Sequence, residues 1–285
     1  MTQDVPMIQD SPTPRSHRYL RPSRFWAIRQ GFPRSWAIAL VSIALGVPLA
    51  LWIGLSYGGL VTPFFLPTPT QVAQTGYRLL MEEGLGLDIL VSCGRVAAAF
   101  VLAGIIGVPI GIAMGTFSSM ENLFAPIAGL VRYMPVTALV PLIILWVGLG
   151  EESKITIITL SIVFYNAIMV ADAVKFIPND LINVAYTLGG NRWDVLRRVI
   201  LPATFPSVLD TLRVNMSTAW NFMVIAELVA AQDGLGITIM QAQRFLHTDK
   251  VLFGILVIGL IGVATDFAMK TLFAKLTPWA DQTRA

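Results

Sequence analysis

Long uncharged apolar stretches, separated by short clusters of charge, dominate the pattern along the chain. The longest uncharged run covers residues 35–77, and five further runs contain 13 residues or more. Several are close to the roughly 20 residues that a helix needs to cross a bilayer. With the runs as cores, the pattern predicts six transmembrane helices, near 36–57, 88–115, 123–149, 154–175, 206–231 and 251–274. We therefore expect an all-α polytopic membrane protein.

Composition supports the membrane class and excludes several others. Apolar residues make up 55% of the 285, and 37 residues are charged, about half the number in an average soluble chain. The net charge of +3 is too small to indicate nucleic-acid binding. Cys93 is the single cysteine and the chain has two histidines, so the sequence offers no intramolecular disulfide and no Cys/His metal cluster.

Basic residues are distributed unequally between the two sides of the predicted membrane. With the amino terminus inside, 13 of the 20 lysines and arginines fall in cytoplasmic parts and 4 in outer loops. This asymmetry predicts that both termini are cytoplasmic. We expect an arginine-rich tail at 1–35, a transmembrane domain at 36–275 and a short tail at 276–285. The run at 36–57 is too long for a cleavable signal segment, so it is interpreted as a retained span.

Two predicted spans carry special residues. Gly107, Gly111 and Gly115 share one face of the second span, which favours close helix packing, with a pore-lining role as the alternative. The third span contains three prolines and should be kinked, with Arg132 near the inner water interface and 122–131 along the surface.

The cytoplasmic loop 176–206 has the pattern of two short amphipathic helices. Asn179 or Asp180 can cap the first, Gly189 and Gly190 end it, and Asn191 can cap the second. Helical spacing gives each helix an apolar face, formed by Leu181, Val184, Ala185 and Leu188 in the first and by Trp193, Leu196, Val199 and Ile200 in the second. Such a loop can lie on the anionic inner leaflet or dock into a groove of another protein, and periodicity does not decide between them.

This loop resembles the coupling motif of ABC-importer permeases, written EAA, three residues, G, nine residues, I, one residue, LP. The spacing is kept throughout, and the matching positions are Asn183, Val184, Ala185, Gly189, Val199, Leu201 and Pro202. Asn183 stands where the family usually has Glu, which removes a carboxylate, and Val184 stands where it has Ala. The glycine bend and the apolar face are retained.

The resemblance covers residues 65–275 and extends to the permeases of nitrate, sulfonate and bicarbonate importers. It rests on LPTPTQV at 66–72, LVPLIILWVGLGEESK at 139–154 and AWNFMVIAELVAAQDGLG at 219–236. It implies a type I ABC-importer permease fold and a homodimer in the bacterial inner membrane. It also implies docking onto ABC ATPase subunits through the motif positions together with Gly190, Arg192 and Trp193, and solute delivery by a periplasmic or lipid-anchored binding protein.

The chain has no sign of catalysis of its own. It contains no G-x-x-x-x-G-K-[ST] phosphate loop, so ATP and Mg²⁺ are expected on a partner subunit and no cofactor on this chain. Glu82, Glu83, Glu151 and Glu152 are interpreted as solvated charges of outer loops. A secondary transporter or channel is the alternative function, but it leaves the coupling-motif spacing unexplained.

Ionisable residues inside predicted spans are candidates for function, because burying them in a bilayer is costly. We expect Asp210 with Arg213, Asp266 with Lys270, and Asp172 with Lys175 to pair on their own helices. The fifth span carries a polar stripe that suits the passage of a small anion or, equally, hydrogen bonding between helices. Glu227 should lie near its outer end, in gating or interface contacts. The candidate path residues are Asn215, Ser217, Thr218, Asn221, Glu227 and Arg132.

Overall fold

The computed structural model describes residues 25, 32–230 and 232–280, and their regular structure is helical throughout. The arginine-rich tail predicted at 1–35 lies almost entirely outside these residues. The chain divides into two units, residues 1–54 and 55–285. The first unit contributes most of α1 (Arg34–Tyr57), whose apolar side chains are exposed. The second contains α2 (Pro69–Met81), α3 (Leu85–Thr116), α4 (Ser118–Val131), α5 (Val136–Val147), α6 (Glu151–Lys175), α7 (Asn179–Thr187), α8 (Arg192–Val195), the π-helical turn η2 (Leu196–Ile200), α9 (Leu201–Ala230), α10 (Leu235–Arg244) and α11 (Thr248–Leu276).

Within the described residues, four helices are long and apolar enough to cross a membrane, namely α1, α3, α6 and α11. The pair α4 and α5 adds a fifth span if the two are counted together. The fifth predicted span, 206–231, corresponds to α9, which has 30 residues but does not pass the same test. Its polar stripe lowers its hydropathy, so α9 is a long helix that depends on its neighbours to bury polar groups.

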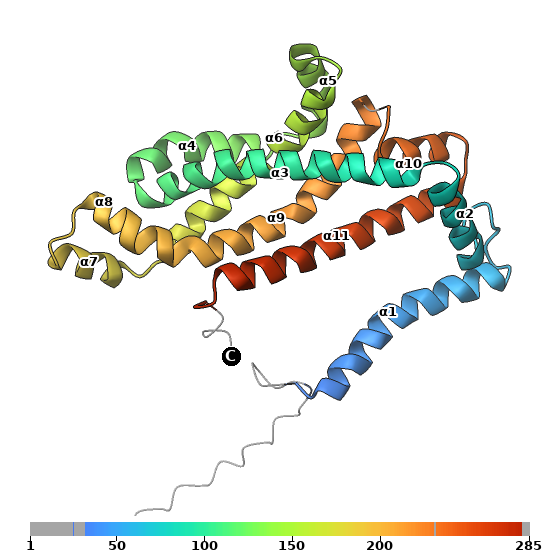
Figure 1. The fold of residues 1–285 in the computed structure, drawn as a ribbon, viewed down its shortest axis with the longest axis horizontal. Coiled ribbons are helices and arrows are strands. Elements are labelled where there is room, and N and C mark those ends of the chain that lie inside the picture. Colours follow the sequence, from blue (N-terminus) through green and yellow to red (C-terminus); the bar gives the residue numbers. More distant parts are fainter. Residues whose placement is uncertain (1–24, 26–31, 231, 281–285) are drawn as a thin grey trace, which may run out of the picture. The chain divides into compact units, whose positions relative to one another are not determined.

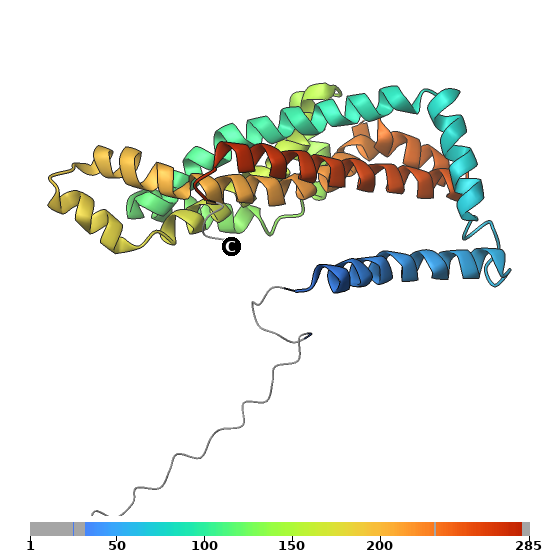
Figure 2. The same cartoon turned by 60° about the horizontal axis from the view of Figure 1, so that its bottom comes forward.

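The core of the second unit lies where α3, α6 and α9 pack together, with α11 alongside α9 (Figure 1, Figure 2). The glycine face of α3 is what allows α3 and α6 to approach closely. A Cβ on Gly107 would lie 2.7 Å from the Val163 carbonyl oxygen, and one on Gly111 would lie 2.6 Å from that of Ala167. The packing interpretation of these glycines is therefore confirmed.

The third predicted span is broken more sharply than expected. Helix α4 ends at Val131, α5 begins at Val136, and the two helices are bent by 100°. Of the three prolines, only Pro135 lies in the break, while Pro126 and Pro141 lie inside helices. A proline lacks the N–H of a continuing helix, but it is tolerated at a helix start, which is where Pro135 stands.

Arg132 lies in this break, and the prediction that it sits near the inner interface is wrong. Its backbone carbonyl accepts a hydrogen bond of 3.5 Å from the hydroxyl of Tyr165. Tyr165 is ten residues from the inner end of α6, hence about 15 Å along the helix axis. Arg132 is therefore level with the middle of α6.

The two ends of the second unit carry different structures (Figure 1, Figure 2). Helices α7 and α8 form a hairpin at one end, and α10 and α2 lie at the opposite end. The hairpin contains the loop that the sequence singled out, and the α10 end contains a cluster of charged side chains.

Candidate functional site

The hairpin bends through a glycine pair with a complete helix-stop geometry. Gly189 has φ +82°, its N–H donates to the Tyr186 carbonyl at 2.9 Å, and the N–H of Gly190 donates to the Ala185 carbonyl at 3.0 Å. These two bonds form a Schellman motif, which requires a residue with positive φ at its centre. A Cβ on Gly190 would lie 2.8 Å from the Ala185 carbonyl oxygen. The geometry of the bend therefore favours glycine at both positions.

The second half of the hairpin begins at Asn191, as predicted. The Asn191 side chain accepts hydrogen bonds from the backbone N–H of Trp193 at 2.9 Å and of Asp194 at 3.1 Å, and the Asp194 carboxylate accepts one from the Asn191 N–H at 3.2 Å. This reciprocal capping fixes the start of α8. The helix continues through the π turn η2, where the N–H of Leu201 reaches back to the carbonyl of Leu196, into α9. Such turns are frequent at functional sites.

The start of α7 differs from the prediction. Pro178 occupies the capping position, and neither Asn179 nor Asp180 caps the helix, since both are already helical residues. Proline is compatible with a helix start, because a backbone N–H at this point would have no partner within the helix.

The apolar residues of the hairpin divide into an inner and an outer set. Ile182 and Ala185 pack inward on a small core formed by Val174, Val195 and Ile200. Leu181, Val184 and Leu188 remain 49%, 56% and 83% exposed. The predicted face is therefore correct except at Ala185, which is half-buried inside the subunit.

A hollow of about 780 Å³ lies beside this outer set. Its wall is formed by the outer face of α7, by the start of α9 around Pro202 and by the segment after α11, through Trp279. Trp279 is 57% exposed. The sequence interpretation missed Trp279, although a tryptophan in a short polar tail is a signal that could have drawn attention to it.

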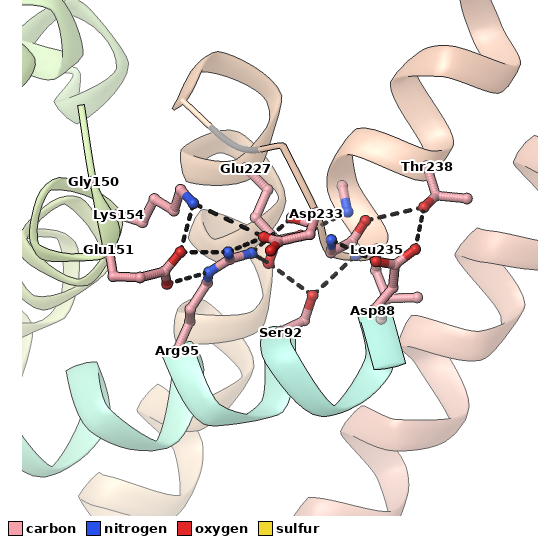
Figure 3. A network of polar contacts seen from close by, with 12 residues as sticks. Asp88, Ser92, Arg95, Gly150, Glu151, Lys154, Glu227, Asp233, Leu235 and Thr238 are labelled. Carbon is pink, nitrogen blue, oxygen red and sulfur yellow. Dashed lines mark hydrogen bonds and ion pairs between the residues drawn. The ribbon is translucent and has the colours of Figure 1, made fainter. Parts of the chain in front are cut away.

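At the opposite end, Arg95 joins three carboxylates from three segments of the chain (Figure 3). Its Nε and Nη2 donate to Glu151 at 2.7 Å each, Nη1 donates to Glu227 and to the Asp233 carbonyl at 2.8 Å, and Nη2 also donates to the Asp233 carboxylate. All five N–H donors of a guanidinium are thereby used. Arg95 is 2% exposed, so it cannot take a further anion without losing these bonds.

Glu227 extends the network to the turn before α10. Its Oε1 accepts from the Ser92 hydroxyl at 2.7 Å, and its Oε2 accepts from the N–H of Gly236 at 2.7 Å. Asp88 accepts from the N–H of Gly234 at 2.9 Å, where φ is +110°. The carboxylates of α3 and α9 therefore hold the turn that leads into α10 (Figure 3).

The network carries a net negative charge, and its side chains are bonded to one another. Its basic members are Arg95 and Lys154, whereas its acidic members are Asp88, Glu151, Glu227 and Asp233. A site with this balance repels a solute anion.

Glu151 is 52% exposed, as expected of a solvated charge, but it begins α6 instead of lying in a loop, and its carboxylate is paired with Arg95 and with Lys154 at 2.7 Å. The missed signal was the spacing of Asp88, Ser92 and Arg95, which places them on one face of α3. Three polar groups on one face of an apolar helix require partners from neighbouring helices.

For Lys175 and Asp266, pairing on their own helices was also the wrong expectation. Arg213 on α9 pairs with Asp266 on α11 at 2.7 Å, and Lys175 pairs with Glu121 on α4 at 2.6 Å. These bridges link helices that pack side by side, so neighbouring helices provided nearer partners than the next helical turn.

The polar stripe of α9 splits into buried and exposed parts. Asn215 is 4% exposed and donates to the Asn166 side chain at 2.7 Å, and Glu227 is fully buried in the network. Ser217 and Asn221 are exposed and Thr218 is half-buried. The stripe thus contains hydrogen bonding between helices at Asn215 and an exposed polar surface at Ser217 and Asn221, where the Ser217 hydroxyl donates to the Val214 carbonyl at 2.8 Å. Among the described residues, no group of three His, Cys, Asp or Glu side chains could hold a metal ion.

Comparison with known proteins agrees with this architecture. Residues 107–278 match the family described as binding-protein-dependent transport system inner membrane component. The chain is 36% identical over 253 residues to the taurine transport system permease protein TauC of Escherichia coli (strain K12), covering 87% of this chain and 92% of the relative.

A second relative and a solved structure extend the likeness. The putative aliphatic sulfonates transport permease protein SsuC of Bacillus subtilis (strain 168) is 33% identical, over 82% of this chain and 84% of the relative. An inward-facing structure of the MetNI methionine ABC transporter matches with a TM-score of 0.63 and 18% identity, covering 69% of this chain and 98% of that chain, which supports the fold. The chain therefore belongs to the family of binding-protein-dependent transport system inner membrane components, the permease subunits of ABC importers.

Proposed function

We propose that this permease subunit forms the translocation path of an ATP-driven importer for a small anion, such as taurine or another sulfonate, nitrate or bicarbonate. The observation that carries the proposal is the hairpin of α7 and α8. Its coupling-motif glycine has φ +82°, and its outer apolar side chains stay exposed at the end of the unit that is predicted to be cytoplasmic. An exposed apolar face beside a hollow is typical of a protein-docking surface.

In this proposal, ATP hydrolysis and solute capture are carried out by partner proteins. ATP and Mg²⁺ belong to an ABC ATPase subunit, which docks on the hairpin. Solute capture belongs to a periplasmic or lipid-anchored binding protein, and a second copy of the chain completes the path. The chain lies in the bacterial inner membrane, in contact with lipid and with both termini in the cytoplasm.

The proposed docking region comprises Leu181 and Leu188, the motif residues Asn183, Val184, Ala185, Gly189, Val199, Leu201 and Pro202, and Gly190, Arg192 and Trp193. Trp193 is 64% exposed and lies 5.8 Å from the guanidinium of Arg197, so it presents an aromatic surface beside a positive charge. Ala185 supports the face from within, because it packs on the small core of the hairpin, whereas Leu201 is 37% exposed.

A charge on this face tests the docking. Val184→Asp places a carboxylate where docking of the ATPase would exclude water from the side chain. Burial of this unpaired charge should lower copurification with the ATPase at least about tenfold. Asn179→Asp places the same charge on the first residue of α7, away from the face, and should leave copurification unchanged. Equal copurification of wild type and Val184→Asp would contradict the docking proposal.

The path is proposed along the exposed part of the α9 stripe, at Ser217, Thr218 and Asn221, with Arg132 near it. Neutral hydrogen-bond donors let a hydrated anion pass without holding it tightly. Asn215 and Glu227 are buried, so they support the path from inside the subunit.

Replacement of Asn221 tests this path. Asn221→Leu removes the amide and adds apolar bulk, so uptake should fall while assembly and solute capture persist. Asn221→Ser keeps a polar group and should retain uptake. Normal uptake by Asn221→Leu would assign the exposed stripe to helix packing.

The orientation is tested with cysteines in a Cys93→Ser background. A cysteine at Asn191 should resist a membrane-impermeant thiol reagent in intact cells, whereas one at Arg244 should react. Labelling at position 191 and protection at position 244 would show that the orientation is the opposite of the one proposed.

A further inference from the structure

The break between α4 and α5 places non-helical backbone level with the middle of the neighbouring helix α6. Residues 132–135 are exposed in the subunit, and Arg132 contacts Tyr165 through its carbonyl. Backbone that leaves the helix at membrane depth is tolerated only where it is buried in protein or lines a water-filled cavity. Because residues 132–135 are exposed in this subunit, we infer the second condition, a water-filled cavity, for the break.

Arg132 is the cation at this break, and within the described part of the chain it forms no ion pair with a carboxylate. Its Nη2 donates to the Tyr133 hydroxyl at 2.8 Å, and the guanidinium carbon lies 4.7 Å from the centre of the Tyr133 ring. A charged side chain at membrane depth is costly, so it typically faces a water-filled cavity and marks a functional site. Arg95 is the opposite case, because all five of its donors are used by carboxylates and a carbonyl.

A hollow of about 310 Å³ surrounds the Arg132 side chain. It lies between the α4–α5 break, the middle of α6 and Phe222 of α9, and its lining residues include Tyr133, Thr137 and Tyr165, which carry hydroxyl groups. The Tyr165 hydroxyl donates to the Arg132 carbonyl, whereas Tyr133 accepts from Arg132 and keeps its own O–H free to donate. The hollow thus offers N–H and O–H donors around one positive charge.

This hollow also adjoins the proposed path, since Phe222 is the residue after Asn221 on α9. An exposed guanidinium binds an anion less firmly than a buried one, because water screens the charge. Weak binding suits a transport site, which must release what it takes up.

We propose that this hollow is a binding site of the permease itself for a small oxyanion, whose delocalised negative charge is received by Arg132 and the hydroxyl groups of Tyr133 and Thr137. The inference rests on the proposed importer function and adds a resting point for the solute inside the membrane domain. Sulfonate, nitrate and bicarbonate share the required chemistry, namely several oxygens that accept hydrogen bonds and carry one negative charge.

The test uses thiol reagents of opposite charge on a cysteine placed in the wall. Thr137→Cys in a Cys93→Ser background is prepared as the complex with its ATPase in lipid nanodiscs. Its reaction rates with a sulfonate-bearing and a trimethylammonium-bearing methanethiosulfonate are then compared. Arg132→Gln should lower the ratio of the anionic to the cationic rate at least about tenfold, because the positive charge that lines the same hollow is removed. Arg132→Lys should keep most of the ratio.

Two comparisons separate this site from a general charge effect. Arg244→Gln removes an exposed arginine outside the hollow and should leave the ratio unchanged. Taurine, nitrate or bicarbonate in the medium should slow labelling of Thr137→Cys, and the most protective anion identifies the ligand class. The same rates at Phe222→Cys test the opposite wall.

An unchanged ratio in Arg132→Gln at both cysteines, or absence of protection by every anion, would overturn the proposed site. This assay needs no transport and no binding protein. ATP-driven uptake together with an unchanged ratio would therefore refute only the site, whereas a charge-dependent ratio without ATP-driven uptake would refute only the importer function.

Discussion

Removal of Arg95 should be among the most destabilising single changes in this chain. Arg95→Met leaves Glu227, which is fully buried, with only the Ser92 hydroxyl and the Gly236 N–H as partners. Leaving one charge of a buried ion pair uncompensated typically costs about 3–5 kcal/mol. Whole proteins are stable by about 5–15 kcal/mol, so the loss is a large fraction of the total.

The three carboxylates around Arg95 should contribute unequally. Glu151 and Asp233 are 52% and 55% exposed, so water screens their attraction to Arg95. Glu151→Gln should therefore cost less than about 1 kcal/mol. Glu227→Gln added to Arg95→Met removes the buried charge while its amide oxygen can still accept from Gly236. The double variant should be more stable than Arg95→Met alone.

The free energy of unfolding can be measured by titration with SDS in mixed micelles, followed by circular dichroism. Arg244→Met replaces an exposed arginine of α10 and should change stability by less than about 0.5 kcal/mol. A loss below about 1 kcal/mol for Arg95→Met would refute the structural role of the network. Additive effects of the Arg95 and Glu227 changes would refute their coupling.

Three further changes test other parts of the structure. Gly189→Val forces a β-branched residue to φ +82°, at a cost of about 1–3 kcal/mol, and should lower solute-stimulated ATP hydrolysis without loss of membrane insertion; normal stimulation would exclude the bend from coupling. Gly111→Val should destabilise the chain by about 1–3 kcal/mol in SDS titration, because its Cβ would lie 2.6 Å from an α6 carbonyl, whereas Gly94→Ala has open space and should be tolerated. Trp279→Ala removes one wall of the hollow beside α7 and should weaken copurification with the ATPase; unchanged copurification would place Trp279 outside the docking surface.

Local sequence patterns were sufficient to predict much of the fold and of the hairpin. Apolar runs and helical spacing depend on residues close in the chain, and so do the Schellman glycines and the Asn191 cap. The glycine face of α3 was also readable, because small residues four apart can only serve a close neighbour.

The remaining features depend on which helices become neighbours, and a single sequence does not contain that information. Arg95 bonds to residues 56 to 138 positions away, and Asn215 reaches Asn166 across a helix interface. Three prolines indicated a kink, but the 100° bend and the level of Arg132 follow from contacts with α6. Periodicity therefore identified the polar groups inside the helices, but it did not predict which residues they bond to.

The central claim is that this chain carries an anion only when an ATPase drives it. The most direct measurement is uptake of radiolabelled taurine and nitrate into proteoliposomes that contain this chain, its ATPase and its binding protein. The account predicts uptake that requires MgATP and all three components and that is lost when Val184→Asp removes ATPase docking. Uptake driven by an ion gradient, without ATP or the ATPase, would contradict it and identify the chain as a secondary transporter.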